Sequence, residues 1–112
     1  MRCMGSNFKI IYMPSAQNSV HDLRSFIFSQ SQDLHAADKV IRRIVIYIDN
    51  LTFNPFMGRI LSEYNLKTKD VRRITAEKRY NIYYSVNEQA REVYILKIAD
   101  GRQSMKRQLL GL

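Results

Sequence analysis

The sequence predicts an α+β fold with the element order β-α-α-β-β-β-β, in which a helical hairpin packs on one face of a small, mainly antiparallel twisted sheet. Three observations predict it. A mostly apolar run at residues 8–13 comes first, two stretches with helical spacing follow, and three strand-like runs lie close together between residues 71 and 99. At 112 residues the chain is expected to form one domain, with residues 1–7 as a loose start and residues 103–112 as a basic tail.

Two amphipathic helices are predicted after the first strand. Ser15 is expected to cap a helix that runs to about residue 32, and Asp33 a second helix over residues 34–51. A short polar turn between them indicates an antiparallel hairpin, which needs a sheet on which to bury its apolar stripes. The stripes consist of Ala16, Val20, Leu23, Phe26 and Ile27, and of Ala37, Val40, Ile41, Ile44, Val45, Ile48 and Leu51.

The second half of the chain is expected to form the rest of the sheet. Pro55 ends the helical region, residues 60–64 are expected to be a short edge strand, and residues 65–70 a loop. Strands follow at 71–75, 79–86 and 92–99, with turns at 76–78 and 87–91, and short connections predict an antiparallel meander. The tail, residues 102–112, forms either a short docking helix or a frayed end.

Alternation along the strand at 79–86 assigns its side chains to two faces. Tyr80, Ile82, Tyr84 and Val86 lie on one face and Asn81, Tyr83 and Ser85 on the other. The first set is expected to lie in the core under the helices. The second is expected to lie on an open face, where we place the function.

Composition narrows the kinds of partner. The chain has 18 Lys and Arg against 10 Asp and Glu, a net charge of +8, which favours acidic partners, either nucleic acid or protein. Cys3 is the only cysteine, so neither an internal disulfide nor a cysteine metal site is expected. The carboxylates show no metal-ligand spacing, and neither a metal nor another cofactor is expected. No signal peptide and no membrane span is recognised, so the cytoplasm is the expected location.

The order and spacing of several short motifs resemble those of the RelE/ParE superfamily of type II toxin–antitoxin toxins. The resemblance covers residues 8 to about 102. The matching segments are Ser15-Ala16 with Asp22-Leu23 and Ile27, Ala36-Ala37, Asn54-Pro55-Phe56-Met57-Gly58-Arg59, Val71-Arg72-Arg73-Ile74, Tyr80-Asn81-Ile82-Tyr83-Tyr84-Ser85-Val86, and Ile98-Ala99-Asp100-Gly101-Arg102-Gln103. The fourth and fifth are similar to the family's "vR.l" and "Y.I.Y.V" strands, and the last stands where the family has "HGRR".

The resemblance implies a toxin with two alternative targets. ParE-type toxins poison DNA gyrase, whereas RelE-type toxins cut mRNA on the ribosome. Both are neutralised by a small antitoxin, and an acidic antitoxin would complement the net charge of this chain. A third alternative is a family member that has lost toxicity and survives as a binding module.

Departures from the RelE pattern favour the ParE-like branch. RelE-type toxins often carry a C-terminal tyrosine, but no tyrosine follows Tyr94 here, and Gln108 stands about where one would fall. Asn81 stands where RelE-type toxins often have an arginine. His21 and His35 lie in the helical hairpin, where surface positions are expected. No catalytic residue is assigned, and a ribosome-dependent endoribonuclease remains the alternative.

A basic cluster supplies the candidates for target binding. It contains Lys67, Lys69, Arg72, Arg73, Lys78 and Arg79, next to Tyr80 and Tyr83. Arg102 matches a family arginine, and Lys106 and Arg107 follow it in the tail. In an alternating strand only one of Arg72 and Arg73 faces the open side. The resemblance implies Arg72, which takes the family's arginine position. The candidates are Arg72, Arg73, Arg79, Tyr83, Arg102, Lys106 and Arg107.

Overall fold

A mixed five-stranded sheet forms the centre of the computed structural model, which describes residues 7–61, 70–110 and 112. The strands lie in the order β1-β5-β4-β3-β2. The first, β1 (Lys9–Tyr12), runs parallel to β5 (Glu92–Asp100). The remaining pairs, which join β5 to β4 (Tyr80–Asn87), β4 to β3 (Arg72–Ala76) and β3 to β2 (Arg59–Ile60), are antiparallel. The predicted fold class is confirmed.

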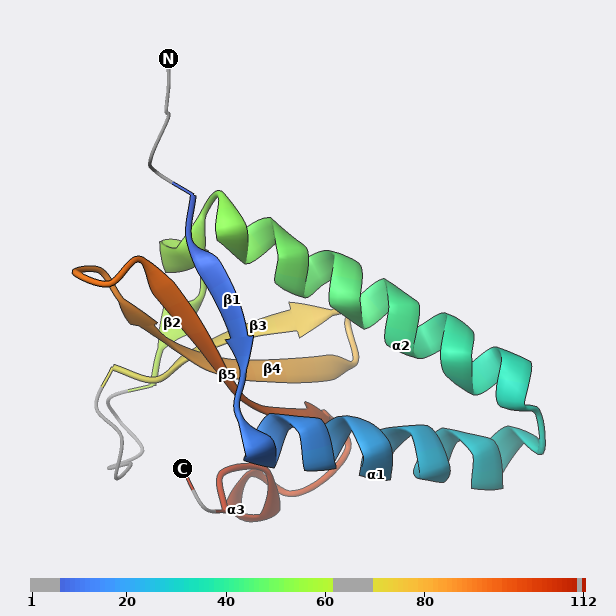
Figure 1. Ribbon diagram of the computed structural model, residues 1–112. Helices are drawn as coiled ribbons and strands as arrows, with labels where there is room; N and C mark the ends of the chain where they lie inside the picture. Colours follow the sequence, from blue (N-terminus) through green and yellow to red (C-terminus); the bar gives the residue numbers. More distant parts are fainter. Residues whose placement is uncertain (1–6, 62–69, 111) are drawn as a thin grey trace.

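Helices α1 (Pro14–Ser31) and α2 (Leu34–Asp49) form the expected hairpin over one face of the sheet (Figure 1). We call this the inner face, and the opposite one the outer face. Two short 3₁₀ helices, Asn50–Thr52 and Pro55–Met57, lead from α2 to β2. Among the described residues, no helix combines the length and the apolar character needed to cross a membrane.

Of the two predicted helix caps, Asp33 is confirmed and Ser15 is wrong. Asp33 caps α2, and its carboxylate accepts a hydrogen bond of 2.9 Å from the backbone N–H of His35. Ser15 does not cap α1. The helix begins one residue earlier, because Pro14 at its first position has the φ angle of a helix and no N–H to satisfy. The Ser15 hydroxyl instead donates to the Leu96 carbonyl at 2.7 Å, and so ties α1 to β5.

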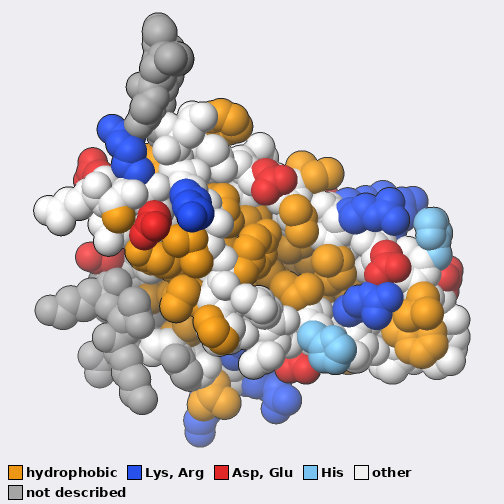
Figure 2. All heavy atoms as spheres, viewed as in Figure 1, with side chains coloured by type: hydrophobic (Ala, Val, Ile, Leu, Met, Phe, Trp, Pro, Cys, Tyr) orange, Lys and Arg blue, Asp and Glu red, His pale blue; other side chains and the backbone are white. Residues whose placement is uncertain are grey.

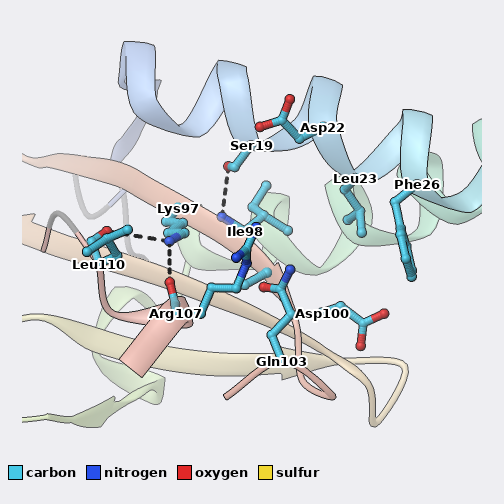
Figure 3. A pocket seen from close by; sticks show the side chains of 11 residues that line it. Ser19, Asp22, Leu23, Phe26, Lys97, Ile98, Asp100, Gln103, Arg107 and Leu110 are labelled. Atoms are coloured by element: carbon cyan, nitrogen blue, oxygen red, sulfur yellow. Dashed lines mark hydrogen bonds between the residues drawn. The ribbon is translucent and has the colours of Figure 1, made fainter. Parts of the chain in front are cut away.

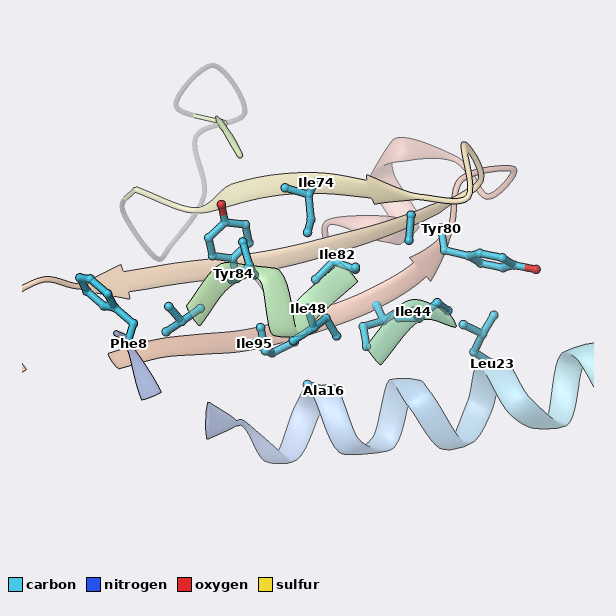
Figure 4. Close-up of a cluster of buried hydrophobic side chains, with 14 residues drawn as sticks. Phe8, Ala16, Leu23, Ile44, Ile48, Ile74, Tyr80, Ile82, Tyr84 and Ile95 are labelled. Atoms are coloured by element: carbon cyan, nitrogen blue, oxygen red, sulfur yellow. The ribbon is translucent and has the colours of Figure 1, made fainter. Parts of the chain in front are cut away.

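The main apolar core lies between the helical hairpin and the inner face (Figure 4). Tyr80, Ile82 and Tyr84 point into it from β4, as predicted, and Ile44 and Ile48 meet them from α2. Each of these side chains is at most 5% exposed. Complete burial of side chains of this size contributes roughly 1.5–3 kcal/mol each, so this layer fixes the hairpin on the sheet.

The outer face is not open where we expected it to be. After β5 the chain turns back as a short helix, α3 (Met105–Gln108), and packs against the outer face (Figure 1). Tyr83 is 0% exposed there. Its neighbours form a second apolar cluster, consisting of Leu61, Val71, Ala99 and Leu112 with Leu96 and Leu109. The tail is therefore a docking segment, and the expected exposure of Tyr83 is wrong.

A bulge in β5 contributes to this arrangement. Tyr83 pairs with Lys97, but Tyr84 pairs with Ile95, so Leu96 is the extra residue. Leu96 packs in the outer cluster, and the Lys97 ammonium contacts the C-terminal segment. The bulge thus allows two successive residues of β5, Leu96 and Lys97, to lie on the outer face.

The remaining boundaries shift by a few residues. α2 ends at Asp49, and Leu51 belongs to the 3₁₀ turn that follows. The expected edge strand at 60–64 is observed as Arg59–Ile60, and its predicted continuation over 62–64 lies outside the described residues. The expected loose start also lies almost wholly outside them.

Candidate functional site

A cleft of about 430 Å³ lies between α1 and the end of β5 with the C-terminal segment (Figure 3). Phe26, 43% exposed, and Leu110, 71% exposed, supply apolar surface at its margins. Charged groups of both signs lie beside them. The lining residues are Ser19, Asp22, Leu23, Phe26, Lys97, Ile98, Ala99, Asp100, Gln103, Arg107 and Leu110.

Asp100 is the electrostatic centre of the cleft. Its side chain is only 5% exposed. The Arg102 guanidinium donates to both carboxylate oxygens, at 2.8 Å from Nη2 and 3.1 Å from Nε, and the Arg102 backbone N–H donates at 2.9 Å. Arg79 lies 3.7 Å away on the same carboxylate. Burial alone would raise the pKa of Asp100, but the hydrogen bonds from Arg102 and the charges of Arg102 and Arg79 hold that pKa below its usual value.

The C-terminal segment positions two further predicted cations. The Lys97 ammonium donates to the carbonyls of Arg107, at 2.9 Å, and Leu110, at 3.4 Å, and so holds this segment beside the cleft. Burial and the nearby Arg107 charge lower the pKa of Lys97. The side chains of Lys106 and Arg107 are exposed.

Arg102 and Arg79 thus meet at one carboxylate, and Arg107 lines the same cleft. The Arg102 guanidinium also lies 5.8 Å from the centre of the Phe26 ring, within the range of a cation–π contact. The structure brings these three predicted residues together at one end of the sheet. Lys67 and Lys69 of the basic cluster lie outside the described residues.

The assignment of Arg72 to the outer face is wrong. Arg72 pairs with Tyr84 and Arg73 with Tyr83, and directly opposed residues share a face. Arg72 therefore lies on the inner side, where its guanidinium donates to the carbonyls of Gly58, at 2.8 Å, and Phe56, at 3.2 Å. Arg73 lies on the outer side and is half-buried. Both arginines lie near the β2–β3 edge, away from the cleft.

Gln108 organises the outer face. It is 1% exposed, and its carbonyl oxygen accepts hydrogen bonds from Asn81 at 2.7 Å and from the Tyr83 hydroxyl at 2.8 Å. Its amide donates to the Gln103 carbonyl at 2.7 Å. Gln108 thus holds the C-terminal segment on the sheet.

Several residues of the site have no counterpart in the sequence prediction. Among the sequence predictions, Asp100 stands only within a segment that resembles the family, and Phe26 only in the apolar stripe of the first helix. The phenol of Tyr94 donates to the Glu92 carboxylate on the outer side of β5, which raises the pKa of Tyr94. The signal for this pair is its spacing, since residues i and i+2 of a strand share a face.

In the described part of the chain, no group of three or more His, Cys, Asp or Glu residues is arranged to hold a metal ion.

Replacing Asp100 with asparagine is expected to lower the free energy of unfolding by about 2 kcal/mol at pH 7, because charge-assisted hydrogen bonds from Arg102 are lost. The native pKa of Asp100 lies below that of the unfolded chain, near 3.9. The stabilisation is therefore complete above about pH 5 and is lost as the pH falls through the lower native pKa. Urea unfolding of both proteins at pH 7, 5 and 3 checks this, and a difference that stays constant with pH would contradict it.

Solved structures place this architecture among the RelE/ParE-like toxins. The chain is similar to a structure titled "Chromosomal ParDE TA system from P. aeruginosa", with a TM-score of 0.67 and 16% identity over 86% of this chain and 98% of the other. The toxin–antitoxin complex RelBE2 from Mycobacterium tuberculosis has a TM-score of 0.54 and 16% sequence identity, and the match covers 84% of this chain and 98% of the other. For the archaeal RelE–RelB complex from Pyrococcus horikoshii OT3 the TM-score is 0.56 and the sequence identity 17%, over 88% of this chain and 99% of the other. At these identities the similarity establishes the fold.

The family follows from the sequence model of the ParE toxin of the type II toxin–antitoxin system parDE, which matches residues 10–105. The chain belongs to this family and is the toxin component of a type II toxin–antitoxin system. The predicted superfamily and its ParE-like branch are confirmed. Among curated proteins, none matches the chain at a significant level.

Proposed function

We propose that this toxin inhibits DNA gyrase by binding to it, and that a cognate antitoxin neutralises the toxin. The observation that supports a binding mode of action is the cover on the outer face. Tyr83 and Asn81, which would be central to a reactive sheet surface, are buried under the C-terminal segment and bonded to Gln108. Arg102, Lys106 and Arg107 are exposed. Arg107 lines the cleft with the exposed Phe26 and Leu110, Arg102 contacts the Phe26 ring, and Lys106 precedes Arg107 in the C-terminal segment.

Such a mixture of arginine, aromatic and aliphatic groups is typical of protein interfaces. We assign target contact to the exposed side chains Phe26, Arg102, Lys106, Arg107 and Leu110. Arg79 holds Asp100 and Arg102 in position. Arg72 and Arg73 are proposed to contribute from the β2–β3 edge. Tyr83 lies beneath this surface and supports it through the hydrogen bond from its hydroxyl to Gln108.

The proposed antitoxin is an acidic protein. The net charge of +8 favours such a partner. Two of the similar structures are titled as complexes of a toxin with its antitoxin. Exposed apolar side chains at the end of α2 and along the β2 edge offer a docking surface, and the edge strand itself can accept an added strand. These side chains are Ile46, Phe53, Phe56, Met57 and Ile60.

A supercoiling assay with purified gyrase and relaxed plasmid tests the target. The toxin is expected to block negative supercoiling, and Arg107→Gln is expected to raise the half-inhibitory concentration at least about tenfold, since a hot-spot arginine contributes 2 kcal/mol or more. Lys9→Gln removes one exposed charge beside Glu92, at the end of β5 away from the cleft. It is the matched control and should inhibit like the wild type. Full supercoiling at a large molar excess of toxin would contradict the proposed target.

The alternative function is cleavage of mRNA on the ribosome. The observation that favours it is the hydrogen bond between Tyr94 and Glu92, because a phenol and a carboxylate are groups that can transfer protons in RNA cleavage. Addition of the toxin to a cell-free translation reaction would then produce mRNA cut at codons, and Tyr94→Phe would abolish the cuts. If neither assay shows an effect and expression leaves growth normal, the chain has the third role, that of a binding module.

A further inference from the structure

The outer side of α2 carries a basic surface that the gyrase proposal does not use. Lys39 and Arg42 are exposed and lie on the side of the helix opposite its buried residues Ala37, Ile44 and Ile48. Figure 2 shows Lys and Arg side chains gathered along this helix. Neither Lys39 nor Arg42 forms an ion pair with a carboxylate in the part of the chain that the structure describes. The one carboxylate beside them on the helix, Asp38, is bound to Arg24 of α1 at 2.7 Å.

The basic surface continues onto the β3–β4 turn. Arg43 of α2 lies 3.4 Å from the Glu77 carboxylate, and the Tyr47 hydroxyl donates to the other oxygen of that group at 3.2 Å. These contacts hold the turn against α2, and the next residue, Lys78, is exposed at the tip of the turn. Folding thus adds a cation from far along the sequence to those of the helix. We call Lys39, Arg42, Arg43 and Lys78 the α2 basic surface.

This arrangement has a cost to the helix. Lys39 and Arg43 are four residues apart, so two like charges lie one above the other on successive turns. Such a pair destabilises a helix, and two carboxylates offset the repulsion in part: Glu77 from outside the helix, and Asp38, four residues before Arg42, from within it. A bound polyanion would remove the repulsion. This face of the helix therefore attracts an anionic partner.

We propose that the α2 basic surface binds the phosphate backbone of duplex DNA without regard to sequence. The cations lie about one helical turn apart on a rigid element, and duplex DNA presents one negative charge per roughly 1.7 Å of its axis. Binding of this kind is driven by release of counterions and needs no base contacts. The proposal stands apart from the gyrase proposal, because it concerns the toxin and DNA alone.

Fluorescence anisotropy of a labelled 20-base-pair DNA duplex, titrated with the purified toxin at several salt concentrations, tests this. The variant Lys39→Gln/Arg42→Gln is expected to lose at least tenfold in affinity at low salt. The slope of log affinity against log salt should also fall by about 2, since each phosphate contact contributes about 0.9. The matched control Lys9→Gln/Arg91→Gln removes the same net charge from the opposite end of the sheet, where Lys9 and Arg91 are joined by a backbone hydrogen bond, and should bind like the wild type.

Several outcomes would overturn the proposal. Equal losses in the two double variants would show attraction to net charge alone, and an unchanged slope in the α2 variant would exclude phosphate contacts there. A duplex RNA of the same sequence that bound more than tenfold tighter would assign the surface to RNA. Circular dichroism of the α2 variant should show the wild-type fold, because the side chains of Lys39 and Arg42 form no ion pair among the described residues. Gyrase inhibition measured on the same variants separates the two proposals, since either can fail while the other holds.

Discussion

Replacing Gln108 with leucine is expected to lower the free energy of unfolding by about 3 kcal/mol. Leucine has a similar volume but leaves the Asn81 amide and the Tyr83 hydroxyl without their partner in a buried site. Each buried polar group that loses its hydrogen bond costs about 1–3 kcal/mol. Urea unfolding followed by circular dichroism measures the effect.

A control and a double-mutant cycle make this result specific. Gln103→Leu changes an exposed side chain five residues away and is expected to shift stability by no more than about 0.5 kcal/mol. The Tyr83 hydroxyl bonds to Gln108, so Tyr83→Phe combined with Gln108→Leu should cost less than the sum of the two single changes. A Gln108→Leu protein as stable as the wild type would mean that the C-terminal segment is not held by this network.

Replacing Gly58 with alanine is expected to destabilise the protein by about 2–3 kcal/mol, because the added methyl group has no space. It would lie 2.9 Å from Cε1 of Tyr84 and 3.0 Å from the carbonyl oxygen of Arg73, and closer still to the Tyr84 hydroxyl. That hydroxyl is fixed, since it accepts from the Gly58 N–H and donates to the Pro55 carbonyl, each at 2.8 Å. The melting temperature measured by calorimetry should fall accordingly.

The same substitution in a Tyr84→Phe background identifies the cause. Removing the hydroxyl removes the closest obstacle, so Gly58→Ala should cost less there than in the wild type. The Arg73 carbonyl remains, so part of the penalty should persist. An equal penalty in the two backgrounds would show that the methyl group is accommodated in some other way.

The helices, the strand order along the chain and the inner face could be predicted because each depends on local periodicity. Alternation placed Tyr80, Ile82 and Tyr84 in the core, since the period of a strand is fixed by its backbone. The same rule could have placed Arg72, because the apolar Ile74 must point inward and Arg72 shares its face. The arginine position of the resembling family was given more weight than this parity, and the assignment was wrong.

The cover on the outer face could not be predicted in the same way. Alternation assigns Tyr83 to a face but does not indicate what lies over that face, which depends on the path of the chain after Gly101. Glutamine is usually exposed, so nothing in the sequence marks Gln108 as buried. Its burial is stabilised by partners on β4 and in the loop before α3, which only the folded chain brings together. Of the candidate site, the sequence therefore located the cations, and the fold determined which of them share a cleft.

The parallel pairing of β1 with β5 has a consequence for how this toxin is made. Lys9 pairs with Glu92, and the Phe8 N–H donates to the carbonyl of Thr52, so the first strand finds its neighbours only after most of the chain exists. Contacts between such distant residues slow folding. Since β1 is one edge of the sheet and β5 is its strand neighbour, a growing chain on the ribosome lacks that edge until β5 has been made. The sheet of a newly made toxin is thus completed late in synthesis, after the segments that form α1, α2 and β2 to β4.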